Sequence, residues 1–172
     1  DWLYLDPARR TAEQRRVVGL ADCEPDVTKH IALFLKKADR ILIKVSPLLD
    51  IKQTLLEVPQ ITTIHVVAVE NECRELLLEI APTSSKPLVK TVNFKNDGNV
   101  QRFDFPLEKE QNAEVTFSAP LRYLYEPNAA LLKAGAFRSV AALFQISKKA
   151  PHSHLYNSND LNAHNPGRLF YI

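Results

Sequence analysis

The stretch Ile64-His65-Val66-Val67-Ala68-Val69-Glu70 is a nearly continuous apolar run rich in β-branched residues. Such a strand is typical of a parallel sheet that helices cover on both faces. A second β-branched run spans 40–46, and apolar residues recur at helical spacing over 48–58 between the two runs. A further helix is expected over 27–38, because acidic residues precede it and two lysines end it. The alternation of strands and helices predicts an α/β fold.

The first residues of the chain add one more short strand, Trp2 to Leu5, which leads into Asp6-Pro7-Ala8-Arg9-Arg10. Open α/β folds bind ligands at the carboxyl ends of their strands. A carboxylate there can accept hydrogen bonds from a substrate, while Arg9 and Arg10 can grip phosphate. An ordinary turn with solvated arginines explains the same spacing equally well. Lys44 and Ser46 end the next strand and could face the same crevice, although a structural role for each is the favoured interpretation.

The alternation of expected strands and helices ends near Pro82, where the segment Pro82-Thr83-Ser84-Ser85-Lys86-Pro87 indicates a boundary. We expect Glu75 to Ile80 to return as an antiparallel edge strand, and a smaller β-containing unit to begin with a hairpin of 89–94 and 100–105 around Asn96-Asp97-Gly98-Asn99. Residues 127–145 read as helical, with a division at Gly135 because glycine weakens a helix. Two short strands are expected at 154–156 and 168–172. The predicted domains are 1–81, 82–118 and 119–172.

Composition narrows the function classes without choosing one. The 172 residues are 45% hydrophobic and 24% charged, which excludes a disordered chain, and a net charge of +2 does not by itself indicate nucleic-acid binding. Cys23 and Cys73 lack the spacing of a metal motif, and a reduced, cytoplasmic setting is expected. His152, His154 and His164 with Asp160 could gather a metal ion, but we interpret them as loop residues. The sequence contains no Met, and we interpret it as a piece of a longer protein.

Two sets of segments carry a resemblance to a known family. Residues 2–10, 20–26, 43–50 and 69–76 resemble the second half of a class I S-adenosylmethionine-dependent methyltransferase. Residues 123–137, 153–156 and 166–170 are similar to the THUMP-like C-terminal domain of one bacterial branch of that superfamily. The resemblance implies an α/β plus α+β fold: the carboxyl half of a Rossmann-like methyltransferase sheet, then a small ferredoxin-like or THUMP-like domain.

The resemblance also implies roles for residues. Asp6, Pro7, Ala8 and Arg9 would follow the fourth strand of the Rossmann-like sheet and lie beside the methyl group and the acceptor, with Asp6 as the leading active-site residue. Enzymes that methylate an exocyclic base nitrogen commonly place an aromatic ring where this chain has Arg9, so that it stacks on an extruded base. Some RNA uridine carbon-5 methyltransferases use a cysteine nucleophile where this chain has Ser46-Pro47. A noncovalent methyl transfer is therefore favoured over covalent carbon methylation.

The cofactor implied for the full-length protein is S-adenosylmethionine, which this superfamily binds on a glycine-rich turn. The four glycines here, Gly19, Gly98, Gly135 and Gly167, are too dispersed to form such a turn. We therefore expect the 172 residues alone to be inactive and not to bind the cofactor measurably.

The THUMP-like resemblance implies RNA as the partner. The sequence has no apolar run of membrane length, so no membrane is expected to be involved. Cations would contact its phosphates, and Tyr123, Tyr125 or Tyr156 could stack on bases, although a small core is the favoured place for these tyrosines. The alternative to an enzyme is a non-catalytic RNA-binding or assembly module. The candidate substrate-binding residues are Arg10, Lys44, Ser46, Lys133, Arg138, Lys148, Lys149 and Arg168.

Overall fold

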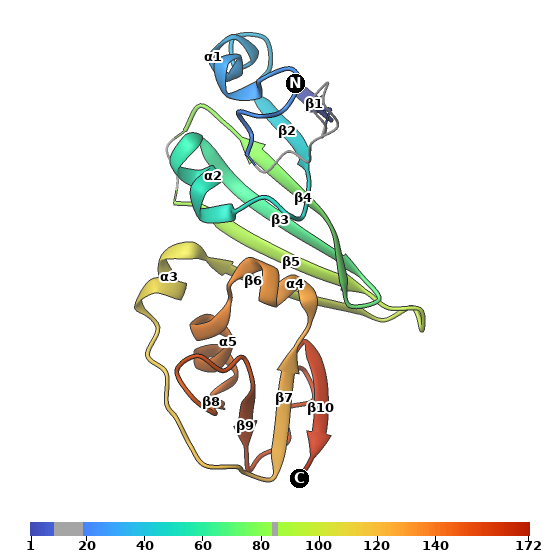
Figure 1. Cartoon of the computed structure of the whole chain (residues 1–172), viewed down its shortest axis with the longest axis vertical. Coiled ribbons are helices and arrows are strands. Elements are labelled where there is room, and N and C mark those ends of the chain that lie inside the picture. The colour runs from blue at the N-terminus through green and yellow to red at the C-terminus, as the bar shows by residue number, and fades with distance from the viewer. Residues whose placement is uncertain (9–18, 84–85) are drawn as a thin grey trace.

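The computed structural model describes residues 1–8, 19–83 and 86–172, which form two sheets with helices packed between and beside them (Figure 1). The first sheet and its helices come from the first two thirds of the chain, and the second sheet with two helices follows. The first part contains β1 (Trp2–Leu5), the 3-10 helix η1 (Val27–Lys29), α1 (Ile31–Phe34), β2 (Arg40–Val45), α2 (Ile51–Glu57), β3 (Ile61–Val69), β4 (Glu72–Ile80), β5 (Leu88–Phe94), β6 (Val100–Pro106) and α3 (Leu107–Asn112). The second part contains β7 (Tyr123–Pro127), α4 (Ala129–Ala134), α5 (Phe137–Phe144), β8 (Ser147–Lys148), β9 (Tyr156–Ser158) and β10 (Gly167–Tyr171).

The first sheet has six strands in the order β1-β2-β4-β3-β5-β6. β1 pairs parallel with β2, and β3 pairs parallel with β5, while the other neighbours are antiparallel. β4 is antiparallel as predicted, but its expected place at an edge is wrong. Glu70 and Asn71 both have positive φ, which closes a tight hairpin to β3, and β2 then pairs with the other side of β4. The sheet is consequently mixed rather than parallel.

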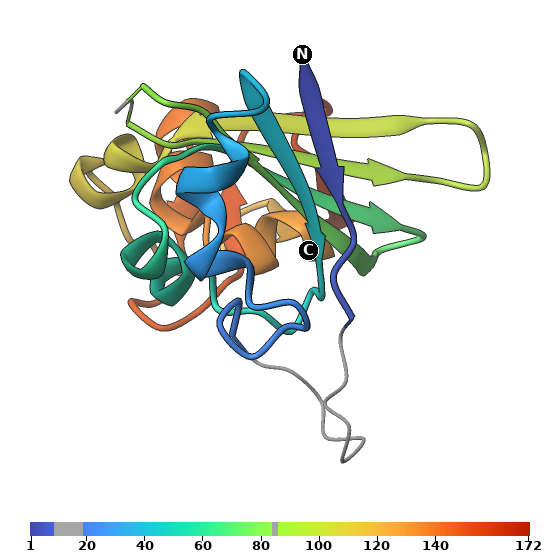
Figure 2. The same ribbon diagram turned by 90° about the horizontal axis from the view of Figure 1, so that it is seen from above.

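Only one face of this sheet is covered by helices in the described part of the chain. Along β2, Ile41, Ile43 and Val45 are buried while the intervening side chains are half-buried or exposed. Viewed from above, α1 and α2 lie together on one side of β1 and β2 (Figure 2). The expectation of helices on both faces is therefore wrong for the described residues, and the alternating burial is that of a sheet with one open face.

The hairpin of β5 and β6 belongs to this same sheet. Val89 to Phe94 pairs with Ile64 to Val69 of β3, so the hairpin extends the first sheet rather than starting a separate one. The predicted Asn96-Asp97-Gly98-Asn99 turn is confirmed, with Gly98 at φ 80°. One hydrophobic cluster continues from these strands to the second sheet, and α4 packs on β3, β4 and β5. The division into 1–81, 82–118 and 119–172 stays a prediction.

The second sheet has the order β10-β7-β9-β8, entirely antiparallel. The predicted division of the helical stretch at Gly135 is confirmed: α4 ends there because Gly135 takes a left-handed conformation with φ 70°. Gly167 has a different reason to be glycine, since a Cβ would lie 2.1 Å from the Glu126 carbonyl oxygen on β7. The strand expected at 154–156 begins at Tyr156 instead, and 115–117 makes only a single bridge, Phe117 to Lys148.

The local helix predictions hold less well where segments are short. Residues 27–38 form η1 and then α1, not one helix, and Asp26 caps the first through its carboxylate. α3 and β8 have no counterpart among the expected elements. The carboxylate of Glu110 on α3 accepts hydrogen bonds from the backbone N–H groups of Phe137, Arg138 and Ser139, which begins α5.

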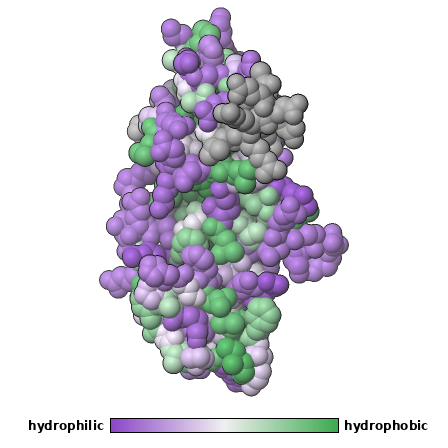
Figure 3. All heavy atoms as spheres, in the orientation of Figure 1, coloured by the Kyte–Doolittle hydropathy of each residue, from purple (hydrophilic) through white to green (hydrophobic). Residues whose placement is uncertain are grey.

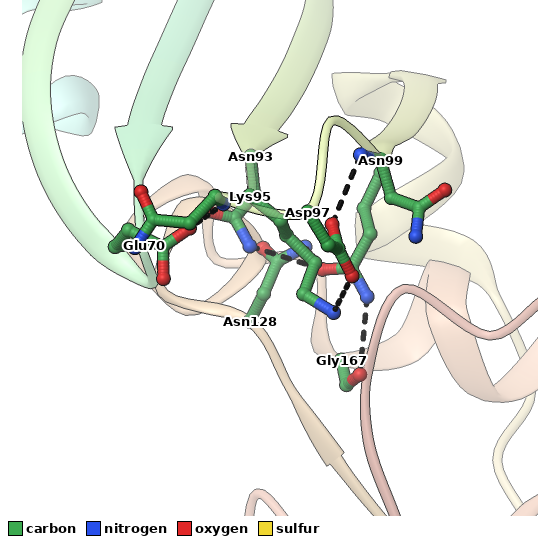
Figure 4. Close-up of polar contacts among 9 residues, drawn as sticks. Glu70, Asn93, Lys95, Asp97, Asn99, Asn128 and Gly167 are labelled. Atoms are coloured by element: carbon green, nitrogen blue, oxygen red, sulfur yellow. Dashed lines mark hydrogen bonds and ion pairs between the residues drawn. The ribbon is translucent and has the colours of Figure 1, made fainter.

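A chain of amide side chains joins the two sheets (Figure 4). The side-chain oxygen of Gln101 accepts hydrogen bonds from the side-chain amides of Asn93 at 3.0 Å and Asn128 at 3.1 Å. The side-chain amide nitrogen of Gln101 donates to the backbone carbonyl of Gly167. Asn71 bonds Asn93 and also accepts from the Ala129 backbone N–H. Asn93 and Asn128 are each 3% exposed, so these bonds fix the second sheet against the first.

No helix among the described residues is long and apolar enough to cross a membrane.

Candidate active-site edge

The parallel pairing of β1 and β2 determines the geometry of the candidate site. The register matches Leu5 with Ile43, so the next residues, Asp6 and Lys44, lie side by side on the open face. Their side chains form an ion pair, with Lys44 Nζ 2.5 Å from Asp6 Oδ2. Two residues that the sequence analysis selected separately are therefore in direct contact.

The ion pair lies at the open edge of the sheet rather than in its core. The side chains of Lys44 and Asp6 are 28% and 41% exposed. The hydrogen bond to Asp6 raises the pKa of Lys44, against an opposing effect of partial burial, and Tyr4 and Glu75 raise it further. Lys44 therefore remains an ammonium at neutral pH and is a poor candidate for a general base.

Tyr4 and Glu75 were missed as site residues. Tyr4 is on β1, two residues before Asp6, so the two side chains share the open face of the sheet. Tyr4 is 55% exposed. Glu75 comes from β4, which pairs with β2. The period-two alternation of Trp2-Leu3-Tyr4-Leu5-Asp6 carried the signal for Tyr4. Glu75 carried none, because its proximity to Lys44 depends on the interior position of β4.

The residues after Asp6 contribute to the backbone of this edge. Pro7 is buried, and Ala8 forms an antiparallel bridge with Glu24, with its N–H donating to the Glu24 carbonyl at 3.0 Å. Arg9 and Arg10 lie outside the described residues. Asp6 is thus held between a strand and a bridged segment, which limits the directions in which its carboxylate can point.

Ser46 lies just beyond β2 and has a local structural contact. Its hydroxyl accepts a hydrogen bond from the Leu48 backbone N–H at 3.2 Å, and its carbonyl accepts from Leu49. These bonds close the turn that leads to α2, whose first turn Asp50 caps. The favoured structural interpretation of Ser46 agrees with this geometry.

Two of the predicted substrate-binding lysines are engaged elsewhere. Lys148 is 6% exposed, its ammonium donates to the Pro151 carbonyl at 3.0 Å, and burial lowers its pKa. This burial and the bond to Pro151 argue against the predicted phosphate contact. Lys133 is half-buried and donates to the Leu49 carbonyl at 2.8 Å, tying α4 to the turn after β2.

The remaining predicted cations lie on the second part of the chain. Arg138 is exposed and donates to the Ala113 carbonyl at 3.2 Å. Lys149 is half-buried. Arg168 is exposed and forms an ion pair with Glu126, with Nε 2.7 Å from Oε2. Arg138 and Arg168 contact Ala113 and Glu126 rather than Asp6 or Lys44, so within the described residues the candidates do not form one cluster.

The three candidate tyrosines differ in burial. Tyr125 and Tyr156 are 1% and 0% exposed, so the alternative that they stack on bases is wrong. Tyr156 donates to the Phe137 carbonyl and Tyr125 to the Asp160 carbonyl, which confirms the favoured core placement. Tyr123 is only half-buried. His154 stacks on Phe137, and no group of three or more metal-ligating side chains is placed to hold a metal ion in residues 1–8, 19–83 and 86–172.

The glycines do not form a cofactor cradle. Gly98 and Gly135 occupy left-handed turns, and Gly167 allows close contact between β10 and β7. The backbone N–H of Gly19 donates a hydrogen bond to the Asp22 carboxylate at 3.1 Å. Among the described residues, the four glycines therefore form no glycine-rich turn of the kind that adenosylmethionine sites use.

Comparisons with known proteins bear on both parts of the chain. Residues 123–166 match the model of a ferredoxin-like domain. Over 99% of its length, the chain is similar to the crystal structure of a "putative methyltransferase" from Porphyromonas gingivalis W83, with 34% sequence identity and a TM-score of 0.89. The chain spans 43% of the length of that protein. No curated protein matches the chain.

Proposed function

We propose that this chain forms part of an S-adenosylmethionine-dependent methyltransferase of the cytoplasm that acts on RNA. The observation that supports the proposal most strongly is the Asp6–Lys44 ion pair at the carboxyl ends of two parallel strands. The similarity to the Porphyromonas gingivalis "putative methyltransferase" over 99% of this chain supports the same reaction class. The finer assignments, class I and THUMP-like, rest on the sequence resemblance.

In the proposed site, Asp6 accepts a hydrogen bond from the nucleophilic group of the acceptor and so orients its lone pair. Lys44 holds the Asp6 carboxylate in place through the ion pair. This division of labour suits a noncovalent transfer, in which the enzyme contributes mainly by positioning the reactants. The methyl donor would be bound by residues outside these 172, since the glycines here form no cradle for it.

The 172-residue chain alone is then inactive. Isothermal titration with S-adenosylmethionine tests this part of the proposal, and we expect no heat of binding. Binding with a micromolar dissociation constant would contradict it, because the 172 residues would then have to supply a complete cofactor site.

The activity itself is tested on the longer protein that contains this chain. We expect it to transfer a tritium-labelled methyl group from S-adenosylmethionine to RNA, with the label released by ribonuclease. Label that resists ribonuclease and is released by protease would show a protein acceptor and overturn the RNA assignment. Absence of transfer to any acceptor would overturn the enzymatic proposal.

A further inference from the structure

The outer strand of the second sheet, β10, has an unusual surface. Four consecutive apolar residues, 169–172, are exposed there, with Phe170 at 45% and Tyr171 at 70%. Apolar side chains gather over this strand toward the lower end of the molecule (Figure 3). Sheet edges in soluble proteins usually carry charges that prevent pairing with other strands. An edge with consecutive apolar side chains therefore indicates a binding surface.

Two arginines accompany the aromatic rings of this strand. The Arg122 guanidinium lies 5.5 Å from the Tyr123 ring centroid and 5.4 Å from that of Tyr171. The Arg168 guanidinium lies 6.0 Å from the Phe170 centroid, and its Nε donates a hydrogen bond to Glu126 at 2.7 Å. We call Arg122, Tyr123, Arg168, Phe170 and Tyr171 the β10 aromatic cluster. A guanidinium lies over each of the Phe170 and Tyr171 rings, and both rings remain partly exposed.

Charge is also unevenly distributed along the chain. Residues 119–172 contain six Lys and Arg against two Asp and Glu, a net charge of +4, whereas 1–118 carry a net −2. Lys148 is buried, so the other charged groups of 119–172, a segment of 54 residues, leave a net charge of +3 that attracts a polyanion. A protein partner would explain exposed apolar residues, but it would not explain their combination with arginines and a locally basic unit.

We propose that the β10 aromatic cluster binds single-stranded RNA by stacking unpaired bases on Phe170 and Tyr171, with Arg122 and Arg168 beside the backbone. Aromatic platforms next to cations are the general means of holding single strands, and they exclude duplexes because paired bases expose no ring faces. This inference rests on the proposed function, since the RNA held here would be the methyl acceptor. It assigns the contact to β10, away from the Asp6–Lys44 edge on β1 and β2.

The direct test uses the 172-residue chain and a fluorescein-labelled oligouridine of about ten nucleotides, within the usual site size of such surfaces. Fluorescence anisotropy gives the dissociation constant. We expect Tyr171→Ala and Phe170→Ala each to weaken binding by about 5- to 100-fold. Tyr171→Phe should bind as the wild type does, because the ring is retained.

Phe94→Ala is the matched control. Phe94 is an aromatic residue on a strand, and its exposed fraction of 42% is similar to the 45% of Phe170. We expect it to bind as the wild type does. Thermal melting of each variant checks that the fold is intact. Three results would overturn the proposal: no binding by the wild type, equal losses in Phe94→Ala and Tyr171→Ala, or binding to duplex RNA or single-stranded DNA that is tighter than to single-stranded RNA.

The failure of this inference is distinguishable from that of the proposed function. If the longer protein methylates RNA and Tyr171→Ala leaves its KM for RNA unchanged, the cluster is wrong and the function stands. If no methyl transfer occurs while Tyr171→Ala still weakens oligonucleotide binding, the cluster stands and the enzymatic proposal is wrong.

Discussion

Lys44 and Asp6 lie opposite one another on adjacent parallel strands, and Lys44 Nζ is 2.5 Å from Asp6 Oδ2. They are 38 residues apart in sequence and become neighbours because β1 and β2 pair in register. Both side chains remain partly exposed while in contact. The pair is therefore a product of the strand register and sits where open sheets place ligand contacts.

The ion pair has a testable electrostatic consequence. Because Asp6 raises the pKa of Lys44, Asp6→Asn should lower that pKa toward its ordinary value of 10.5. The stability that this shift contributes is fully present below pH 10.5 and is lost as the pH rises through the folded-state pKa. NMR titration of the Lys44 ε-methylene measures the shift.

A matched control for this titration is Asp97→Asn, which removes the ion pair with Lys95 in the β5–β6 turn. We expect it to leave the Lys44 pKa unchanged. An unchanged Lys44 pKa in Asp6→Asn would show that the two groups do not interact in solution.

The amide junction between the sheets should contribute strongly to stability. Gln101→Leu keeps the size of the side chain but leaves the buried amides of Asn93 and Asn128 without an acceptor. Each unsatisfied buried group costs about 1–3 kcal/mol, so the free energy of unfolding should fall by several kcal/mol. Urea denaturation measures the loss. Gln111→Leu, at an exposed position of α3, should change it little, and equal effects of the two substitutions would contradict the junction's role.

The Glu110 carboxylate should act as the cap of α5. It accepts from three backbone N–H groups, at 3.0, 2.8 and 2.8 Å. Glu110→Ala should lower the free energy of unfolding by about 1–2 kcal/mol, in the range of helix-cap losses. Glu110→Gln should recover part of the loss, because an amide oxygen still accepts. Glu114→Ala, an exposed glutamate nearby, is the control, and a loss as large as that of Glu110→Ala would argue against capping.

Local sequence patterns predicted the elements better than their arrangement. The helix break at Gly135 and the turn at Gly98 were predictable because each needs a backbone conformation that glycine favours. The position of β4 was not, because pairing between β2 and β4 joins residues such as Val45 and Leu76 that no local pattern connects. The same limit applies to Lys148, whose ammonium lies 5.8 Å from the Phe137 ring centroid on α5, a contact that no local pattern indicates.

Within the candidate site, the sequence identified residues at the ends of strands but not their contacts. Asp6 and Lys44 were selectable because polar residues follow or end apolar strands. Tyr4 and Glu75 were not selected, since a tyrosine inside a strand and a glutamate in a charged strand are ordinary surface residues. The bond of Lys133 to the Leu49 carbonyl was not predictable from local sequence, because it spans 84 residues.

The central claim is that Asp6 positions the methyl acceptor, and steady-state methyl transfer by the longer protein tests it most directly. Asp6→Asn should lower kcat by about 100-fold or more, as expected when an acceptor-orienting group is lost, with little change in the melting temperature. Asp97→Asn should leave kcat unchanged. A kcat for Asp6→Asn equal to that of the wild type would contradict the claim.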